Sequence, residues 1–222
     1  MRESLKNKQI RMGGVLDQLY ATYPNSHCSL EHHSPFQLLI STMLSAQCTD
    51  ERVNKVTPEL FKFYPTAPAM ASASVEHLAE LVRSTGFFNS KSRNMSACAR
   101  MLLESHGGEV PAELDALVKL PGVGRKTANV VLGTAFNIPG LVVDTHVIRI
   151  ANLLRFTNQK DAVKIERELQ GVVDKEHWVM FTHLIIDHGR AVCIARRPQC
   201  HECVLAEFCP SVLPEEAIKR KK

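Results

Sequence analysis

Long apolar runs are missing from this sequence of 222 residues, and aromatic residues are few, with one Trp and three Tyr. No stretch approaches the roughly 18 consecutive apolar residues of a membrane-spanning helix, and the N-terminus lacks the apolar segment of a secretory signal. The formal net charge is only +4, which by itself predicts no polyanionic partner. Hydrophobic residues still make up 45% of the chain, which is enough to bury a core. We therefore expect a soluble, intracellular protein.

Alternating patterns, which predict β-strands, are nearly absent, and the best strand-like piece is the short GLVVD at residues 140–144. Helical periodicity and helix start signals recur instead. Ser34 followed by Pro35 predicts the start of one helix, and Thr49 predicts the start of another. Pro58 is expected to kink or split that second helix. The sequence thus predicts an all-α protein of about ten helices joined by short loops.

We do not expect the seven cysteines to form disulfides, because the reducing compartments inside cells keep thiols free. Cys28, Cys48 and Cys98 are scattered among apolar or small residues and predict ordinary packing. The other four follow a C-x₆-C-x₂-C-x₅-C spacing near the C-terminus: Cys193, Cys200, Cys203 and Cys209. Four thiols this close predict a metal or cluster site. Structural zinc commonly uses two C-x₂-C pairs, so a single pair in one short loop favours a [4Fe–4S] cluster over zinc.

Basic residues stand out at two places near the C-terminus. Arg196 and Arg197 lie between the first two cysteines of this spacing, where they either contact DNA phosphates or only offset the charge of four thiolates. The last four residues, Lys219–Lys222, are all basic and predict a solvated tail.

A glycine-containing turn, PGVG, interrupts the apolar pattern of LPGVGRKTANVV at residues 120–131. Glycine adopts positive φ readily and has no side chain to hold a ligand away. Backbone N–H groups at the start of the following helix favour an anion, because they are unpaired and lie at the positive end of the helix dipole. The turn therefore predicts a DNA phosphate contact at Gly122, Val123, Gly124 and Arg125, which would fix position without reading sequence. The alternative is a plain turn between two helices.

Lys126 stands in the first turn of the helix that follows, where a cation is slightly unfavourable. The helix N-terminus and the neighbouring Arg125 favour the neutral amine, which is the form that attacks an electrophilic carbon. The alternative is a surface lysine that pairs with an acid or touches a phosphate. Asp144, in VVDTHVIR, is expected to cap a helix, and a carboxylate fixed in this way could also stabilise positive charge at a sugar carbon or help to move a proton.

These motifs together resemble the endonuclease III family of DNA glycosylases with abasic-site lyase activity. LPGVGRKTANVV, VDTH, HGR at residues 188–190 and the four-cysteine spacing occur in the family's order, and the resemblance extends from about Val15 to Cys209. It implies a two-lobed, all-α helix-hairpin-helix glycosylase. One lobe would be a bundle of about six helices over residues 28–138. The other would combine residues 1–27 with 139–222 and carry the cluster loop at residues 193–209, with the active site in the cleft between the lobes.

By this resemblance Lys126 matches the lysine that forms a Schiff base, and Asp144 matches the essential carboxylate. Gln47 matches the residue that enters the duplex where the damaged base has left. Phe87 stands at the position of an intercalating wedge, where leucine is more usual in bacterial members. The alternative for Phe87 is packing in the core.

The function implied is base-excision repair of double-stranded DNA that contains oxidised pyrimidines or abasic sites, by a monomer in a bacterial cytoplasm at the nucleoid. Two alternatives stay open. A monofunctional adenine mismatch glycosylase shares the hairpin, the aspartate and the cluster, but is longer and lacks the lysine. A non-catalytic or redox-sensing iron–sulfur DNA-binding protein would leave Lys126 and Asp144 unexplained.

Overall fold

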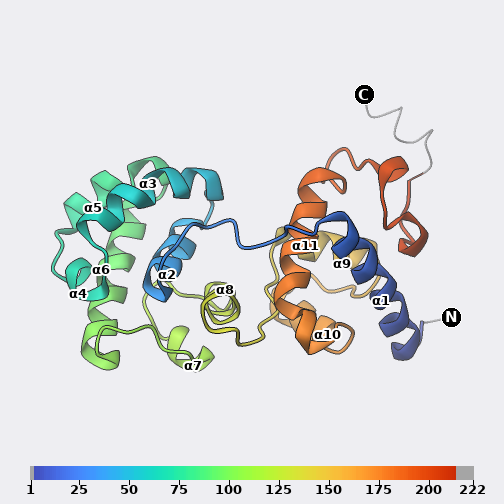
Figure 1. Ribbon diagram of the computed structural model, residues 1–222, viewed down its shortest axis with the longest axis horizontal. Coiled ribbons are helices and arrows are strands. Elements are labelled where there is room, and N and C mark those ends of the chain that lie inside the picture. The colour runs from blue at the N-terminus through green and yellow to red at the C-terminus, as the bar shows by residue number, and fades with distance from the viewer. Residues whose placement is uncertain (1–2, 214–222) are drawn as a thin grey trace. The chain divides into compact units, whose positions relative to one another are not determined.

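The computed structural model describes residues 3–213, and within that range the chain is helical and forms no strand (Figure 1). The prediction of an all-α protein is confirmed. None of the helices in this range combines the length and the apolar composition that a membrane crossing requires. The basic segment Lys219–Lys222 lies outside the described residues.

Two compact units make up the chain. Unit 1 contains the residues up to His27 together with those from Pro139 onward, and unit 2 is Cys28–Ile138. Each unit buries its own hydrophobic core. The helices of unit 2 are α2 (Pro35–Leu44), α3 (Asp50–Phe63), α4 (Ala67–Ala71), α5 (Val75–Leu81), the 3₁₀ helix η1 (Arg83–Thr85), α6 (Phe88–His106), α7 (Leu114–Leu117) and α8 (Arg125–Phe136). Those of unit 1 are α1 (Leu5–Thr22), α9 (Thr145–Leu153), α10 (Ala162–Gln170), η2 (Lys175–His177), α11 (Trp178–Ala191), η3 (Cys200–Glu202) and η4 (Ala206–Phe208).

Helix starts in unit 2 follow side-chain caps that can be read from the sequence. Ser34, Thr49, Thr66 and Ser74 each accept a hydrogen bond from a backbone N–H three residues further on. Such a cap contributes about 1 kcal/mol to helix stability. Within the unit, α6 packs against α4 and α5, and α8 packs against α2. These contacts hold the start of α8 and the end of α2 in one framework.

Helix α3 runs through Pro58 without a break, so the expectation that this proline splits the helix is wrong. Pro58 lies on the exposed face of the helix, while Val53, Thr57 and Leu60 are buried on the other face. Water can satisfy the carbonyl that loses its partner on the exposed side, and burial of the opposite face stabilises the continuous helix.

The strand-like piece at residues 140–144 pairs with a side chain instead of a strand. The Val142 N–H donates to the Thr182 hydroxyl over 3.2 Å, and that hydroxyl donates to the Val142 carbonyl over 3.0 Å. Leu141, Val142 and Val143 are buried, so their apolar character reflects the core of unit 1. A single threonine thus supplies the hydrogen bonds that a neighbouring strand would otherwise provide.

Two glycines allow close packing within unit 1. A Cβ atom at Gly14 of α1 would lie 2.6 Å from the ring of Phe208, and one at Gly189 of α11 would lie 2.4 Å from Nδ1 of His146. Any larger residue would push these elements apart. The absence of a side chain therefore lets the segment around η4 lie against α1, and α9 lie against α11.

Candidate DNA-binding and catalytic residues

The glycine turn forms a tight hairpin between α7 and α8. Gly122 has φ +77°, and a Cβ there would lie 2.8 Å from Cβ of Asn94 and 3.0 Å from Cε of Met43. Val123 is buried, and its N–H donates to the Leu120 carbonyl over 3.0 Å. Only glycine fits this backbone and this space, so the hairpin is anchored to the core while both glycines stay exposed.

Helix α8 begins at the exposed end of that hairpin. Gly124 is its N-cap residue and brings no side-chain acceptor to the first turn. Arg125 and Lys126 are the first two residues of the helix, and both are exposed. Positive potential, donor groups and an accessible amine therefore occur together on one surface of unit 2.

Gln47 and Phe87 also lie in unit 2, each on a turn just beyond a helix end. Gln47 has φ +53° and is exposed, and Phe87 has φ +50° with 65% of its surface exposed. An aromatic residue in the left-handed region is uncommon. The exposure of Phe87 does not agree with the alternative that this side chain packs in the core.

Asp144 is the N-cap of α9 in unit 1, as its position in the sequence predicts. One carboxylate oxygen accepts the Val147 N–H over 2.8 Å, and the residue is half-buried. The bond fixes the direction of the carboxylate and leaves its second oxygen for another partner. Nearby His146 approaches the Arg149 guanidinium over 3.2 Å.

The four clustered cysteines line one cavity of about 270 Å³ in unit 1. Among residues 3–213, no group of three or more His, Cys, Asp or Glu side chains is arranged to hold a single metal ion. Four cysteine thiolates are the usual ligand set of a [4Fe–4S] cluster. Arg196 and Arg197, in the same loop, are exposed.

Three of the thiols that line this cavity, those of Cys193, Cys203 and Cys209, have pKa values raised by burial. Burial raises the pKa of Cys203 to about 11, and the other cysteines add to the increase. Burial also raises the pKa of Cys193 and of Cys209. Iron binding would favour deprotonation, because a thiol loses its proton when it becomes a thiolate ligand of iron. Four thiols around one cavity therefore fit an iron–sulfur cluster.

Buried His188 lies beside this cavity. Its Nε2 lies 3.5 Å from the Cys203 sulfur, and the Tyr23 hydroxyl lies 3.1 Å from its Nδ1. Burial and Arg149 lower the pKa of His188 to about 4, so the ring is neutral at pH 7. The motif HGR marks this histidine in the sequence, but its contact with Cys203 and Tyr23 depends on tertiary packing.

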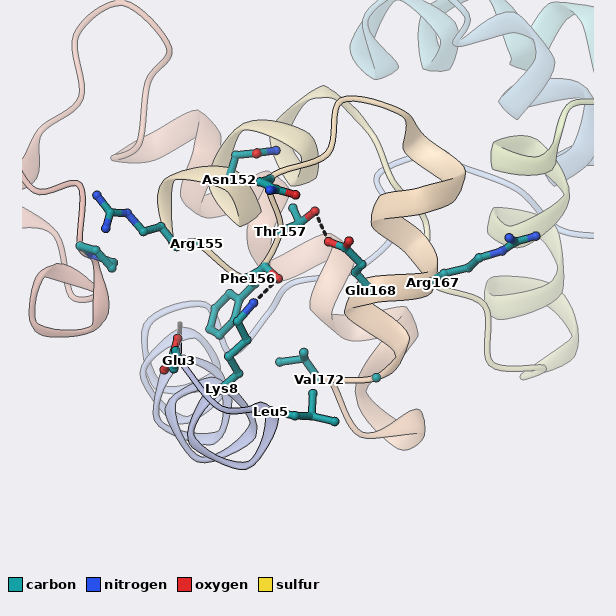
Figure 2. Close-up of a pocket in the computed structure, with 13 residues that line it drawn as sticks. Glu3, Leu5, Lys8, Asn152, Arg155, Phe156, Thr157, Arg167, Glu168 and Val172 are labelled. Atoms are coloured by element: carbon teal, nitrogen blue, oxygen red, sulfur yellow. Dashed lines mark hydrogen bonds between the residues drawn. The ribbon is translucent and has the colours of Figure 1, made fainter. Parts of the chain in front are cut away.

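A second hollow in unit 1, of about 940 Å³, contains none of the predicted site residues (Figure 2). Figure 2 shows the Lys8 ammonium directed at the Phe156 carbonyl and the Thr157 hydroxyl directed at Glu168, contacts of 3.0 Å and 2.5 Å. These polar groups satisfy one another.

Comparisons with known proteins define the class first. The HhH-GPD superfamily base excision DNA repair protein family matches residues 40–175, and the iron-sulfur binding domain of endonuclease III matches residues 193–209. The chain is thus a base-excision DNA repair protein with an iron–sulfur domain.

Individual relatives narrow the class to one family. Endonuclease III of Synechocystis sp. is 49% identical over 208 residues, which cover 93% of this chain and 95% of the relative. A non-covalent endonuclease III–DNA complex has a TM-score of 0.89 at 41% identity, covering 98% of this chain and all of that one. A trapped endonuclease III–DNA covalent intermediate has a TM-score of 0.88 at 41% identity, with both chains fully covered. The chain belongs to the endonuclease III family.

Membership confirms the predicted chemistry at the level of the enzyme class. The protein is a bifunctional DNA glycosylase and abasic-site lyase of base-excision repair, and its cofactor is a [4Fe–4S] cluster. Neither the adenine mismatch glycosylase nor the non-catalytic iron–sulfur protein is favoured.

Proposed function

We propose that the enzyme removes oxidised pyrimidines, such as thymine glycol, from duplex DNA and cleaves the abasic site, with Lys126 as nucleophile. The observation that carries this proposal is the exposure of Lys126 in the first turn of α8, next to a hairpin that can receive a phosphate. A phosphate held at the hairpin would place the sugar beside the Lys126 amine.

The reaction then runs in two stages. The neutral Lys126 amine forms a bond to C1′ while the bond from C1′ to the base breaks, and the base leaves with a proton. The sugar ring opens to give an iminium ion, which makes the C2′ proton acidic. Loss of that proton expels the 3′ phosphate by β-elimination, and water then hydrolyses the imine to free the lysine.

Asp144 is proposed as the carboxylate that stabilises positive charge at C1′ during the first stage and helps to move a proton. Its hydrogen bond to the Val147 N–H supports this role, because a capped carboxylate does not need to be ordered when the substrate binds. An asparagine would keep the cap and remove the charge.

The remaining predicted residues are proposed to hold the DNA. Gln47 enters the space left by the flipped base, and Phe87 wedges between base pairs, in keeping with the exposure of both side chains. Phosphates are proposed to bind separately at the hairpin of unit 2 and at the cluster loop of unit 1. The hairpin residues are Gly122, Val123, Gly124 and Arg125, and the loop residues are Arg196 and Arg197.

Four cysteines are proposed as the cluster ligands: Cys193, Cys200, Cys203 and Cys209. The bound cluster supplies thiolate–iron bonds that hold the loop, and it takes no part in the two stages above. The enzyme is proposed to act as a monomer at the nucleoid of a bacterial cytoplasm, in keeping with its bacterial relatives.

The test is borohydride trapping on a duplex with one thymine glycol. The unaltered protein should give a covalent protein–DNA adduct, and Lys126→Ala should give none. Lys119→Ala is the matched control, because Lys119 is an exposed lysine on the other side of the same hairpin. An adduct that persists in Lys126→Ala, in protein that still binds the duplex, would remove Lys126 from the mechanism.

A further inference from the structure

Backbone strain singles out two turns in unit 2. Among the described residues, four that are not glycine have positive φ: Gln47, Phe87, Asn137 and Arg155. Asparagine tolerates this conformation, but glutamine and phenylalanine seldom adopt it. Strained residues persist only where the surrounding structure holds them in place. The turns of Gln47 and Phe87 therefore need an anchor.

Lys91 of α6 contacts both of these turns. Only 7% of its surface is exposed, and its ammonium donates to the Leu44 carbonyl over 2.8 Å and to the Thr85 carbonyl over 2.9 Å. Leu44 is the last residue of α2, three residues before Gln47, and Thr85 ends η1, two residues before Phe87.

A buried cation at this point has a physical reason. The carbonyl groups at a helix C-terminus lack intrahelical partners and carry the negative end of the helix dipole. An ammonium can donate to two carbonyls from different segments at once, which no uncharged aliphatic side chain can do. The cost of burying the charge is visible in the lowered pKa of Lys91, which burial causes. The backbone N–H of Lys91 also donates to the Phe87 carbonyl over 3.0 Å.

We propose that Lys91 is a positioning residue that ties the Gln47 turn to the Phe87 turn, so that the two side chains enter the duplex as one preformed unit. The proposal rests on the proposed roles of Gln47 and Phe87. Without the ammonium, the Leu44 and Thr85 carbonyls lose a shared partner, and each turn can relax independently. In the variant, the two turns must become ordered when their side chains enter the duplex. In the unaltered protein they are already ordered before DNA binds.

The experiment compares Lys91→Met with the unaltered protein on two substrates. Methionine keeps the length and apolar contacts of the side chain but cannot donate. Single-turnover base release from a thymine glycol duplex should slow by about tenfold or more, equal to about 1.4 kcal/mol. Strand cleavage at an abasic site in single-stranded DNA, which has no opposite base and no stack to enter, should stay within about twofold.

Cys98→Ala is the matched control for lost stability. Cys98 is buried on the same helix, further from the two turns, and it should leave both rates within about twofold. If Lys91→Met lacks a cooperative thermal transition, Lys91→Gln replaces it. The loss should then be smaller but still specific to the duplex, because the glutamine amide can still donate but is shorter and uncharged. Equal losses on both substrates, or no loss on either, would overturn the positioning role.

A double variant, Gln47→Ala with Phe87→Ala, tests the role of Lys91 separately from the proposed roles of Gln47 and Phe87. The double variant should itself lose duplex activity, and adding Lys91→Met should cause little further loss, because the turns then carry nothing to position. Full duplex activity in the double variant would overturn the roles of Gln47 and Phe87, and the positioning role with them. If the double variant releases the base slowly but Lys91→Met releases it at the normal rate, the role of Lys91 is overturned and the roles of Gln47 and Phe87 stand.

Discussion

The two hairpin glycines should respond differently to the same substitution, because only one of them has a structural requirement for glycine. Gly122→Ala places a side chain at φ +77°, which costs about 1–2 kcal/mol relative to glycine. The new methyl group would also lie 2.8 Å from Cβ of Asn94, whose position is fixed by α6, and overpacking of this kind costs about 1–3 kcal/mol. Met43 and the Asn94 amide can move aside.

Together these two effects predict that Gly122→Ala lowers the free energy of unfolding by about 2–5 kcal/mol. For a chain of this length, each kcal/mol lowers the melting temperature by about 2–4 °C, so the expected decrease is about 4–20 °C. Gly124 has φ −93° and ψ 173°, with no atom within 4 Å of an added Cβ. The reduced entropy of the unfolded chain offsets a weaker cap, and Gly124→Ala should change stability by less than about 1 kcal/mol.

Gly122→Ala should be the less stable variant, but Gly124→Ala should be the one that binds duplex DNA more weakly. The affinities are compared at a temperature where both variants are folded. The methyl group of Gly124→Ala lies on the exposed hairpin surface and should weaken binding to a duplex with an abasic-site analogue by about tenfold, or about 1.4 kcal/mol. Thermal melting by circular dichroism and titration by fluorescence anisotropy measure the two effects. A Gly122→Ala protein that melts within 2 °C (~0.5–1 kcal/mol) of the unaltered one would refute the steric argument, and unchanged binding by Gly124→Ala would refute the phosphate contact.

Three further predictions concern Asp144, Cys98 and the cluster loop. Asp144→Asn should keep the α9 cap and bind DNA but lose most base release in a single-turnover assay, whereas Asp144→Ala should also lose about 1 kcal/mol of stability; unchanged turnover in Asp144→Asn would contradict the catalytic role. Burial raises the pKa of Cys98 to about 12, so iodoacetamide should label it at pH 8 only after unfolding. Since the folded pKa lies above the ordinary thiol value of about 8.5, this contribution to stability is complete below that pH and is lost as pH rises toward 12; Cys98→Ala should therefore lessen the alkaline decline in unfolding free energy. Removal of iron by oxidation and chelation should open residues 193–209 to proteolysis without changing cleavage in unit 2, as mass spectrometry of the fragments would reveal; equal cleavage of both units would contradict a local role for the cluster.

Local signals explain which parts of the fold were predictable from the sequence. Ser34 and Asp144 cap helices as expected, because a cap depends on residues only three positions away. Pro58 was expected to kink or split a helix, but it does not split α3, because the core covers the opposite face of that helix. Helix α6 begins at Phe88, directly after the left-handed turn at Phe87, and no side-chain cap marks that start in the sequence.

The candidate site likewise contains residues that local sequence signals predict and one residue whose role depends on tertiary contacts. The hairpin, Lys126 and the four cysteines occur at short spacings that local chemistry makes recognisable, and their individual roles stay predictions. Lys91 gave no signal, because a lysine on a helix normally reaches solvent. Its burial depends on carbonyls that α2 and η1 bring to it from positions 47 and 6 residues away in the sequence.

The division of unit 1 into two sequence segments has a consequence for biosynthesis. Met12, Val15, Leu16 and Leu19 of α1 pack in a core whose other members begin at Leu141. On the ribosome, α1 would emerge on the order of 10–30 s before α11 is complete, at about 5–20 residues per second. All of unit 2 is made within that interval and can bury its own core. The nascent chain therefore carries the apolar stripe of α1 unburied while a second core forms behind it, and variants that slow elongation within unit 2 should lengthen that exposure and favour aggregation.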